Sequence, residues 1–175
     1  MRILSLIGVF VVAIMAFSGV SEAVIIEKGK SYSGGEYLEV AGVGVGFTMP
    51  MGWRGMLPEN LDMFVMTPDN KAYIFVFARK MDKEGLKKLF REPIRLANGI
   101  VLSPTAEPFV TYREISVPYR IENGAAMAGY GRARQGPNGA VVGYIAAGPA
   151  VQGPSLAVTT RNLAKNTTFF EVPQN

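Results

Sequence analysis

Two clusters of basic side chains are the strongest candidates for chemistry in this 175-residue sequence. The first cluster, Lys83, Lys87 and Arg91, repeats every four residues, so the three cations would lie on one face of a helix. Such a face is typical of a solvated helix surface. It is also suited to contact with an anionic surface such as lipid headgroups, a polyanionic glycan or an acidic partner. The spacing predicts a cationic ridge and leaves both roles open.

The second cluster, Tyr130, Arg132 and Arg134, alternates along a predicted strand, so its side chains would share one face. Arginines beside an aromatic ring suit the recognition of carboxylate or phosphate groups. They equally suit the wet face of an antiparallel sheet whose other face is packed. Arg113 is expected opposite Arg134 if Asn123-Gly124 forms a two-residue turn. The candidate binding residues are therefore Lys83, Lys87, Arg91, Tyr130, Arg132 and Arg134.

The residue types that are missing exclude several mechanisms. The sequence contains no histidine and no cysteine. This excludes Ser-His and Cys-His nucleophile systems, thiolate chemistry and zinc sites built from nitrogen or sulfur ligands. The aspartates are isolated from one another, and the nearest acidic pairs lie in polar surroundings. We therefore expect no catalytic residues, no metal site and no cofactor.

A glycine-rich stretch, residues 42–55 (GVGVGFTMPMGWRG), invites comparison with a phosphate-binding loop. The dinucleotide fingerprint requires G-x-G-x-x-G on a turn from strand to helix. The frame that starts at Gly42 ends on Phe47, and the frame that starts at Gly44 ends on Met49. Because both frames fail, the stretch is better explained as a flexible hairpin or bulge beside another element.

The amino terminus is typical of an export signal. A basic start is followed by an uncharged run and by the small-residue site Ser21-Glu22-Ala23, so residues 1–23 are predicted to be a cleaved signal peptide. A retained membrane anchor is the alternative, because the run approaches the roughly 20 residues that span a bilayer. Cleavage predicts a periplasmic or extracellular protein with no transmembrane span after processing.

The net charge of +4 is unchanged by this cleavage, which removes Arg2 and Glu22 together. The charge is modest and export argues against nucleic acid as a partner, so none is expected. Residues 24–36 are rich in glycine and serine and are predicted to be a flexible leader. Residues 37–175 are long enough for one domain with a core of its own.

Hydrophobic periodicity predicts the elements of this domain. Alternating apolar residues from 43 to 49 indicate a half-buried strand, and Asp82 and Pro93 bound an amphipathic helix. The other predicted strands are 62–67, 72–78, 107–121, 125–134, 140–147 and 167–172. A second helix, 155–165 with Ser155 as its cap, is expected to pack on the bare face of Gly129, Gly131 and Ala133. These elements predict an α+β domain, an antiparallel sheet with packed helices.

Four residues at the end of the glycine-rich stretch, Phe47, Pro50, Gly52 and Trp53, resemble the F-x-x-P-x-G-W motif of PsbP-like and DcrB-like domains. The resemblance implies an α/β/α sandwich around an antiparallel sheet, in which the strand ends at the proline and the tryptophan packs under the sheet edge. It also implies a mostly noncatalytic role, as an extrinsic subunit, an envelope accessory protein or a chaperone-like adaptor. The metal-linked histidines of the photosystem subunit have no counterpart here.

These observations favour an exported, noncatalytic accessory or adaptor domain that binds a protein or an anionic envelope component. The alternative is a carrier of a small molecule or lipid, with a pocket between sheet and helix that the many Met, Phe and Tyr residues could line.

Overall fold

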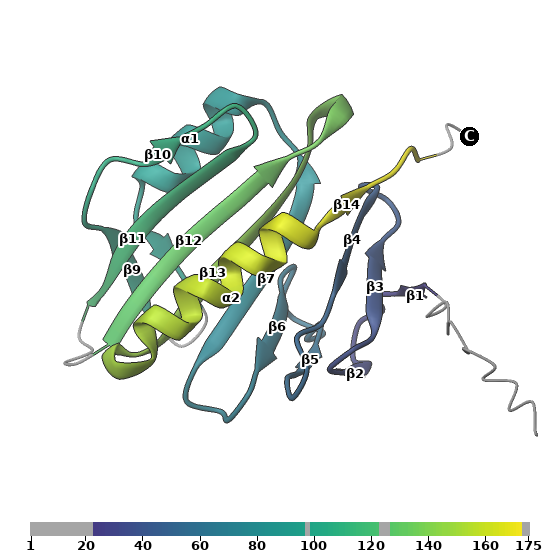
Figure 1. Cartoon of the computed structure of the whole chain (residues 1–175), viewed down its shortest axis with the longest axis horizontal. Helices are drawn as coiled ribbons and strands as arrows, with labels where there is room; N and C mark the ends of the chain where they lie inside the picture. The colour runs from purple at the N-terminus through teal and green to yellow at the C-terminus, as the bar shows by residue number, and fades with distance from the viewer. Residues whose placement is uncertain (1–22, 97–98, 123–126, 173–175) are drawn as a thin grey trace, which may run out of the picture.

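The computed structural model describes residues 23–96, 99–122 and 127–172, which form two β-sheets and two α-helices (Figure 1). The predicted signal peptide, apart from Ala23, and the Asn123-Gly124 turn lie outside these residues. In the part that is described, no helix combines the length and the apolar character needed to cross a bilayer.

The larger sheet has the strand order β2-β5-β6-β7-β13-β12-β11-β9-β8, and β10 also pairs with β11. Its strands are β2 (Ser31–Ser33), β5 (Arg54–Met56), β6 (Phe64–Thr67), β7 (Tyr73–Lys80), β8 (Ile94–Arg95), β9 (Val101–Pro104), β10 (Phe109–Val110), β11 (Glu114–Glu122), β12 (Met127–Gln135) and β13 (Ala140–Pro149). All neighbouring strands in it are antiparallel, which confirms the predicted α+β class with an antiparallel sheet.

The smaller sheet has the order β1-β3-β4-β14, and only its β1–β3 pairing is parallel. Its strands are β1 (Val24–Ile25), β3 (Tyr37–Val40), β4 (Val45–Thr48) and β14 (Thr168–Phe169). The helices are α1 (Lys83–Arg91) and α2 (Gly153–Asn166), and short 3-10 turns lie at Pro137–Gly139 and Ala150–Gln152.

Both faces of the larger sheet are covered, so the protein has two apolar cores. The smaller sheet and α2 cover one face, where Phe47 and Leu163 pack with Tyr144. The helix α1 covers part of the other face, where Leu86 and Phe90 pack with other buried residues. Figure 1 shows α2 lying along β12 and β13. Central strands are therefore apolar on both sides, as β13 illustrates, because all but its last residue are buried.

The first helix forms as its sequence predicts. The carboxylate of Asp82 accepts a hydrogen bond from the Gly85 amide at 2.7 Å, which satisfies a free donor of the first turn. Leu86 and Phe90 are buried and lie one turn apart on the same face. The helix ends at Arg91, before Pro93. The cap and the apolar stripe together account for its length.

The Pro50–Trp53 segment is a tight turn that follows β4. The Trp53 amide donates to the Pro50 carbonyl at 3.1 Å, and Gly52 has a φ of 78°. That left-handed conformation at the third position of the turn favours glycine. Trp53 is half-buried and packs against the core beneath the smaller sheet. The glycine and the proline of the motif thus serve a turn that delivers the tryptophan to the core.

The prediction of a flexible leader at 24–36 is wrong, because this segment contributes β1 and β2 to the two sheets. Tyr32 is buried, and its ring centroid lies 5.7 Å from that of Phe64. A Cβ atom on Gly34 would lie 2.5 Å from the carbonyl oxygen of Pro50. The segment 24–36 therefore packs tightly against the Pro50–Trp53 turn. One apolar residue between two serines is too short a pattern to indicate a buried strand.

The predicted location of the second helix is also wrong. A Cβ atom on Gly131 would lie 3.0 Å from the Phe90 ring, so the small residues of β12 face α1. The helix α2 packs on the opposite face. It begins at Gly153, and no side chain caps it, so Ser155 lies inside its first turn. A strand face made of small residues predicts that another element packs closely on it. The strand sequence does not say which helix that element is.

Candidate functional site

Ion pairs neutralise much of the predicted cationic ridge on α1. Lys87 lies 2.6 Å from the carboxylate of Glu84, and Nε of Arg91 donates to Glu107 at 2.9 Å. Exposed pairs of this kind add little to stability, but they reduce the field that an approaching anion would meet. Lys83, at the start of the helix, forms no ion pair with the described residues.

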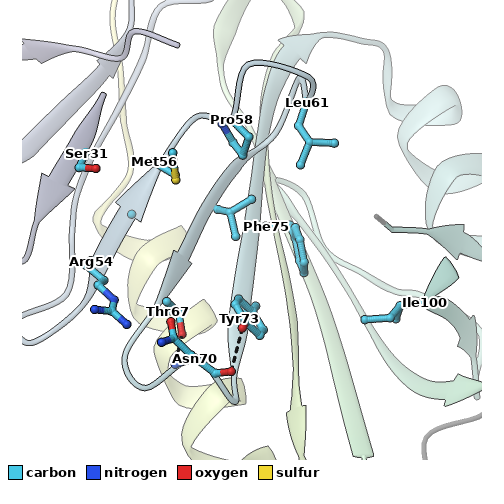
Figure 2. Close-up of a pocket in the computed structure, with 12 residues that line it drawn as sticks. Ser31, Arg54, Met56, Pro58, Leu61, Thr67, Asn70, Tyr73, Phe75 and Ile100 are labelled. Atoms are coloured by element: carbon cyan, nitrogen blue, oxygen red, sulfur yellow. Dashed lines mark hydrogen bonds between the residues drawn. The ribbon is translucent and has the colours of Figure 1, made fainter. Parts of the chain in front are cut away.

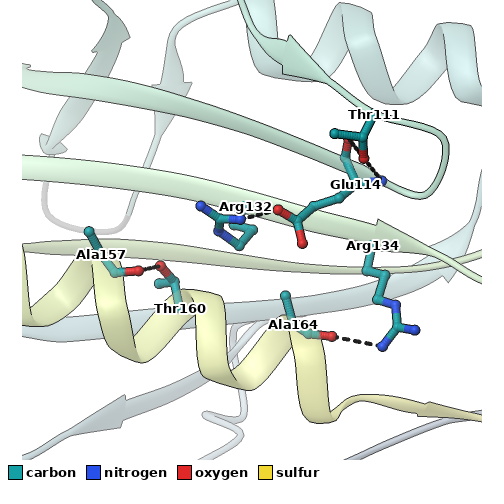
Figure 3. A network of polar contacts seen from close by, with 7 residues as sticks. All are labelled: Thr111, Glu114, Arg132, Arg134, Ala157, Thr160 and Ala164. Carbon is teal, nitrogen blue, oxygen red and sulfur yellow. Dashed lines mark hydrogen bonds and ion pairs between the residues drawn. The ribbon is translucent and has the colours of Figure 1, made fainter.

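The Tyr130, Arg132 and Arg134 side chains do share a face, but α2 covers that face and the expectation of a wet surface is wrong. Arg132 is only 7% exposed and forms an ion pair with Glu114 through Nη1 (Figure 3). Tyr130 is half-buried and packs against the core under α2. Arg132 is therefore held in the interior, and Tyr130 is partly covered by α2.

Arg134 holds the end of α2 (Figure 3). Its Nη1 atom donates to the carbonyl oxygens of Ala164 at 3.0 Å, Lys165 at 2.9 Å and Thr167 at 3.2 Å. A cation at this position satisfies carbonyls that have no partner within the helix and complements the negative end of the helix dipole. These bonds all leave from Nη1, and within the described part Nε and Nη2 donate to no protein acceptor. Part of the guanidinium thus remains available.

The register between β11 and β12 differs from the prediction by one residue. Glu114 stands opposite Arg134, and Arg113 lies just before β11. The Gln135 amide nevertheless donates to the Arg113 carbonyl at 2.9 Å, which fixes the β10–β11 loop beside the end of β12. The expected register would pair Arg120 with Met127, whereas the observed register pairs Arg120 with Ala128.

Three cations meet at a cleft of about 530 Å³, which we call the cationic cleft. Lys83 comes from the start of α1, Arg113 from the β10–β11 loop and Arg134 from the end of β12. The Nε2 atom of Gln135 donates to the Met81 carbonyl at 3.1 Å and ties the helix start to the strand end. Among the described residues, no carboxylate lines this cleft.

Aromatic side chains complete the cationic cleft. The Arg134 guanidinium lies 5.8 Å from the Phe169 ring centroid, and the Arg113 guanidinium lies 5.6 Å from that of Tyr112. Tyr112 is 83% exposed. A Cβ atom on Gly136 would lie 2.2 Å from the Phe169 ring, so only glycine leaves room for this ring at the wall of the cleft. The aromatic contacts restrain two guanidiniums whose planar donors suit carboxylate or phosphate.

This arrangement is suited to binding an anion. No cluster of acidic residues that could hold a metal ion occurs in the residues that the structure describes. Reasoning from sequence identified Lys83 and Arg134 and missed their neighbour Arg113 as a site residue, because the loop that carries it has no periodic pattern. The convergence depends on strand pairing between distant segments.

A second, smaller cavity lies between the larger sheet and the start of α2. Its volume is about 360 Å³, and its lining includes Tyr130, Pro154 and Leu156. This is the region in which a carrier with a pocket between sheet and helix would bind its ligand. No charged side chain lines this cavity in the described ranges.

No protein-family model and no curated protein sequence matches the chain. Among solved structures, it is similar to the solution structure of cyanobacterial PsbP (CyanoP) from Synechocystis sp. PCC 6803, with 11% sequence identity and a TM-score of 0.49. The similarity covers 81% of this chain and 92% of that chain. That protein carries the name of the family that the motif ending at Trp53 resembles.

Proposed function

We propose that the protein is an exported, noncatalytic accessory domain that binds an anionic envelope component through the cationic cleft. The observation that carries this proposal is the convergence of Lys83, Arg113 and Arg134, from three distant segments, on a cleft lined by no described carboxylate. Like charges held together repel one another, and a bound carboxylate or phosphate group removes that repulsion.

The cleft is a better candidate than the ridge that the helical spacing predicts. On the ridge, Lys87 and Arg91 already have carboxylate partners, which an incoming anion would have to displace. In the cationic cleft, Arg113 is exposed and contacts Tyr112 rather than an acid. An exposed tyrosine beside cations also suits the headgroup region of a membrane, where the ring is half apolar and half wet.

The carrier function ranks second. A cavity of about 360 Å³ between sheet and α2 is close to the lower limit of the roughly 300–1,000 Å³ that ligand sites span. Among the described residues, none that lines this cavity carries a charged group that could orient a ligand. The cationic cleft is larger and has three such groups, so we place the anion-binding function first.

A pair of charge-reversal variants tests the proposal. The double variant Lys83→Glu/Arg113→Glu alters the cationic cleft, and Lys87→Glu/Arg91→Glu alters the ridge with the same change in net charge. Co-sedimentation with vesicles of phosphatidylcholine, alone or mixed with phosphatidylglycerol, measures binding to an anionic lipid surface. Pull-down from an envelope extract measures binding to protein partners.

We expect the wild type and the ridge variant to bind an anionic component in one of these assays, and the cleft variant to lose that binding. The binding should weaken as salt is added, because exposed charges are screened beyond a Debye length of about 10 Å at 0.1 M salt. Equal loss in both variants would show a general charge effect and contradict the assignment to the cleft. Absence of wild-type binding in both assays would contradict the function.

A further inference from the structure

A third hollow, on the opposite side of the larger sheet from α2, is mostly apolar and has a volume of about 490 Å³ (Figure 2). Its floor is formed by β5, β6 and β7, on the sheet face that also carries α1. The helix packs against β11 and leaves this end of the sheet free. We call this hollow the apolar groove, and none of the cationic cleft residues lines it.

One end of the apolar groove consists of hydrophobic side chains. Met56, Val65 and Phe75 lie on three neighbouring strands, because Val65 pairs with both Met56 and Phe75 in the sheet register. Pro58 and Leu61, from the loop between β5 and β6, close this end (Figure 2). Met56 is 40% exposed although it is large and apolar. Covering such a surface is favourable, because it removes apolar area from water.

The other end of the apolar groove is polar. Arg54 stands opposite Thr67 in the sheet, next to Asn70 and Tyr73 (Figure 2). The Tyr73 hydroxyl donates to the Asn70 carbonyl at 2.8 Å, and Thr67 Oγ1 is held within the β6–β7 turn by the Ala72 carbonyl at 2.7 Å. Arg54 is exposed and forms no ion pair within the described ranges. It is the one charged side chain among the described residues that line the groove.

We propose that the apolar groove binds a single-chain fatty acid, with its carboxylate at Arg54 and its chain over Val65 and Phe75. A guanidinium presents two parallel N–H donors that match a carboxylate. A fatty acid carries one carboxylate at one end of its chain, and the groove has its one described cation, Arg54, at one end. The volume lies in the lower half of the range for small-molecule sites, which suits one acyl chain rather than the two of a phospholipid. The polar end and the apolar end of the groove are separated along the direction of the strands. The ligand chain would therefore lie parallel to the strands.

Binding of decanoate and of decanol, measured by calorimetry below the concentration at which either aggregates, tests this site. Arg54→Gln should weaken decanoate binding about tenfold and leave decanol binding unchanged, since a hydrogen bond to a charged group is lost. Met56→Glu should weaken both ligands, because it places a charge at the apolar end. The matched controls are Arg161→Gln on α2 and Met51→Glu, at a residue that is 80% exposed and outside the groove.

Amide chemical shifts of the wild type provide a measurement that does not depend on any variant folding. Saturable shifts at Val65 and Phe75, with none at Arg161, support the site. Absence of saturable decanoate binding, or affinities that Met56→Glu leaves unchanged, would overturn it. Equal weakening of decanoate and decanol by Arg54→Gln would overturn the assignment of the carboxylate. Since the cationic cleft uses other residues, charge reversal there should not change decanoate affinity.

Discussion

Two buried tyrosines differ in whether the hydroxyl group has a hydrogen-bond partner, and mutation can test this difference. Tyr119 is 4% exposed and Tyr144 is fully buried. The Tyr144 hydroxyl lies 2.6 Å from Thr167 Oγ1, which itself donates to the Leu163 carbonyl, so Tyr144 must be the donor. The Tyr119 hydroxyl finds no hydrogen-bond partner among the residues that the structure describes. The same substitution, tyrosine to phenylalanine, should therefore have opposite effects at the two positions.

The magnitudes follow from hydrogen-bond energetics. Tyr144→Phe removes a net contribution of about 1 kcal/mol and leaves Thr167 with its bond to Leu163. Tyr119→Phe removes a buried hydroxyl whose unmet hydration costs about 1–3 kcal/mol, so the free energy of unfolding should rise. We expect the free energies of unfolding of the two variants to differ by about 2–4 kcal/mol. For a chain of this length that corresponds to roughly 4–16 °C in Tm.

Urea denaturation followed by circular dichroism measures both variants against the wild type. Burial also raises the pKa of both tyrosines. A raised folded-state pKa means that stability is present below the unfolded value of about 10 and falls as pH rises above it. Tyr119→Phe should make that alkaline fall shallower. If Tyr119→Phe destabilised the protein as much as Tyr144→Phe, its hydroxyl would have to be satisfied, and the reasoning would fail.

Three further changes should each alter the urea midpoint. Arg134→Met should destabilise the fold by about 1–3 kcal/mol, because α2 loses the donor to three terminal carbonyls; an unchanged midpoint would show that these bonds contribute nothing. Gly52→Ala should cost about 1 kcal/mol because φ is 78°, whereas Gly42→Ala, in open space, should be near neutral. Glu114→Gln should cost about 2 kcal/mol or more by leaving Arg132 without its ion pair, and no loss would contradict that role.

Patterns of apolar, capping and turn residues correctly predicted the strands and the helix that are determined by residues close together in the sequence. The alternation at Val45, Phe47 and Met49 corresponds to a row of residues that are almost completely buried, on and just after β4. The cap at Asp82 and the apolar stripe that follows correspond to α1. The β11–β12–β13 meander also matches, because its strands are long and glycine-rich turns are local signals.

Contacts between distant segments could not be predicted in the same way. The connection through β13 decides on which face of β12 the helix α2 packs. The sequence of β12 indicates only that some element packs closely against its small residues. The location of Arg134 shows the same limit, since its spacing suggested an exposed face and the end of α2 occupies that position instead. The cationic cleft and the apolar groove arise from sheet order, so their residues have no common sequence motif.

The smaller sheet joins both ends of the described chain. Near one end, β1 pairs with β3, and near the other, β14 pairs with β4, so Val24 and Phe169 belong to one four-stranded sheet. The sheet cannot be completed until nearly the whole chain is available. Pairings across such sequence distances slow folding. During stepwise synthesis, this sheet would therefore gain its last strand, β14, only after nearly all of the described chain has been made.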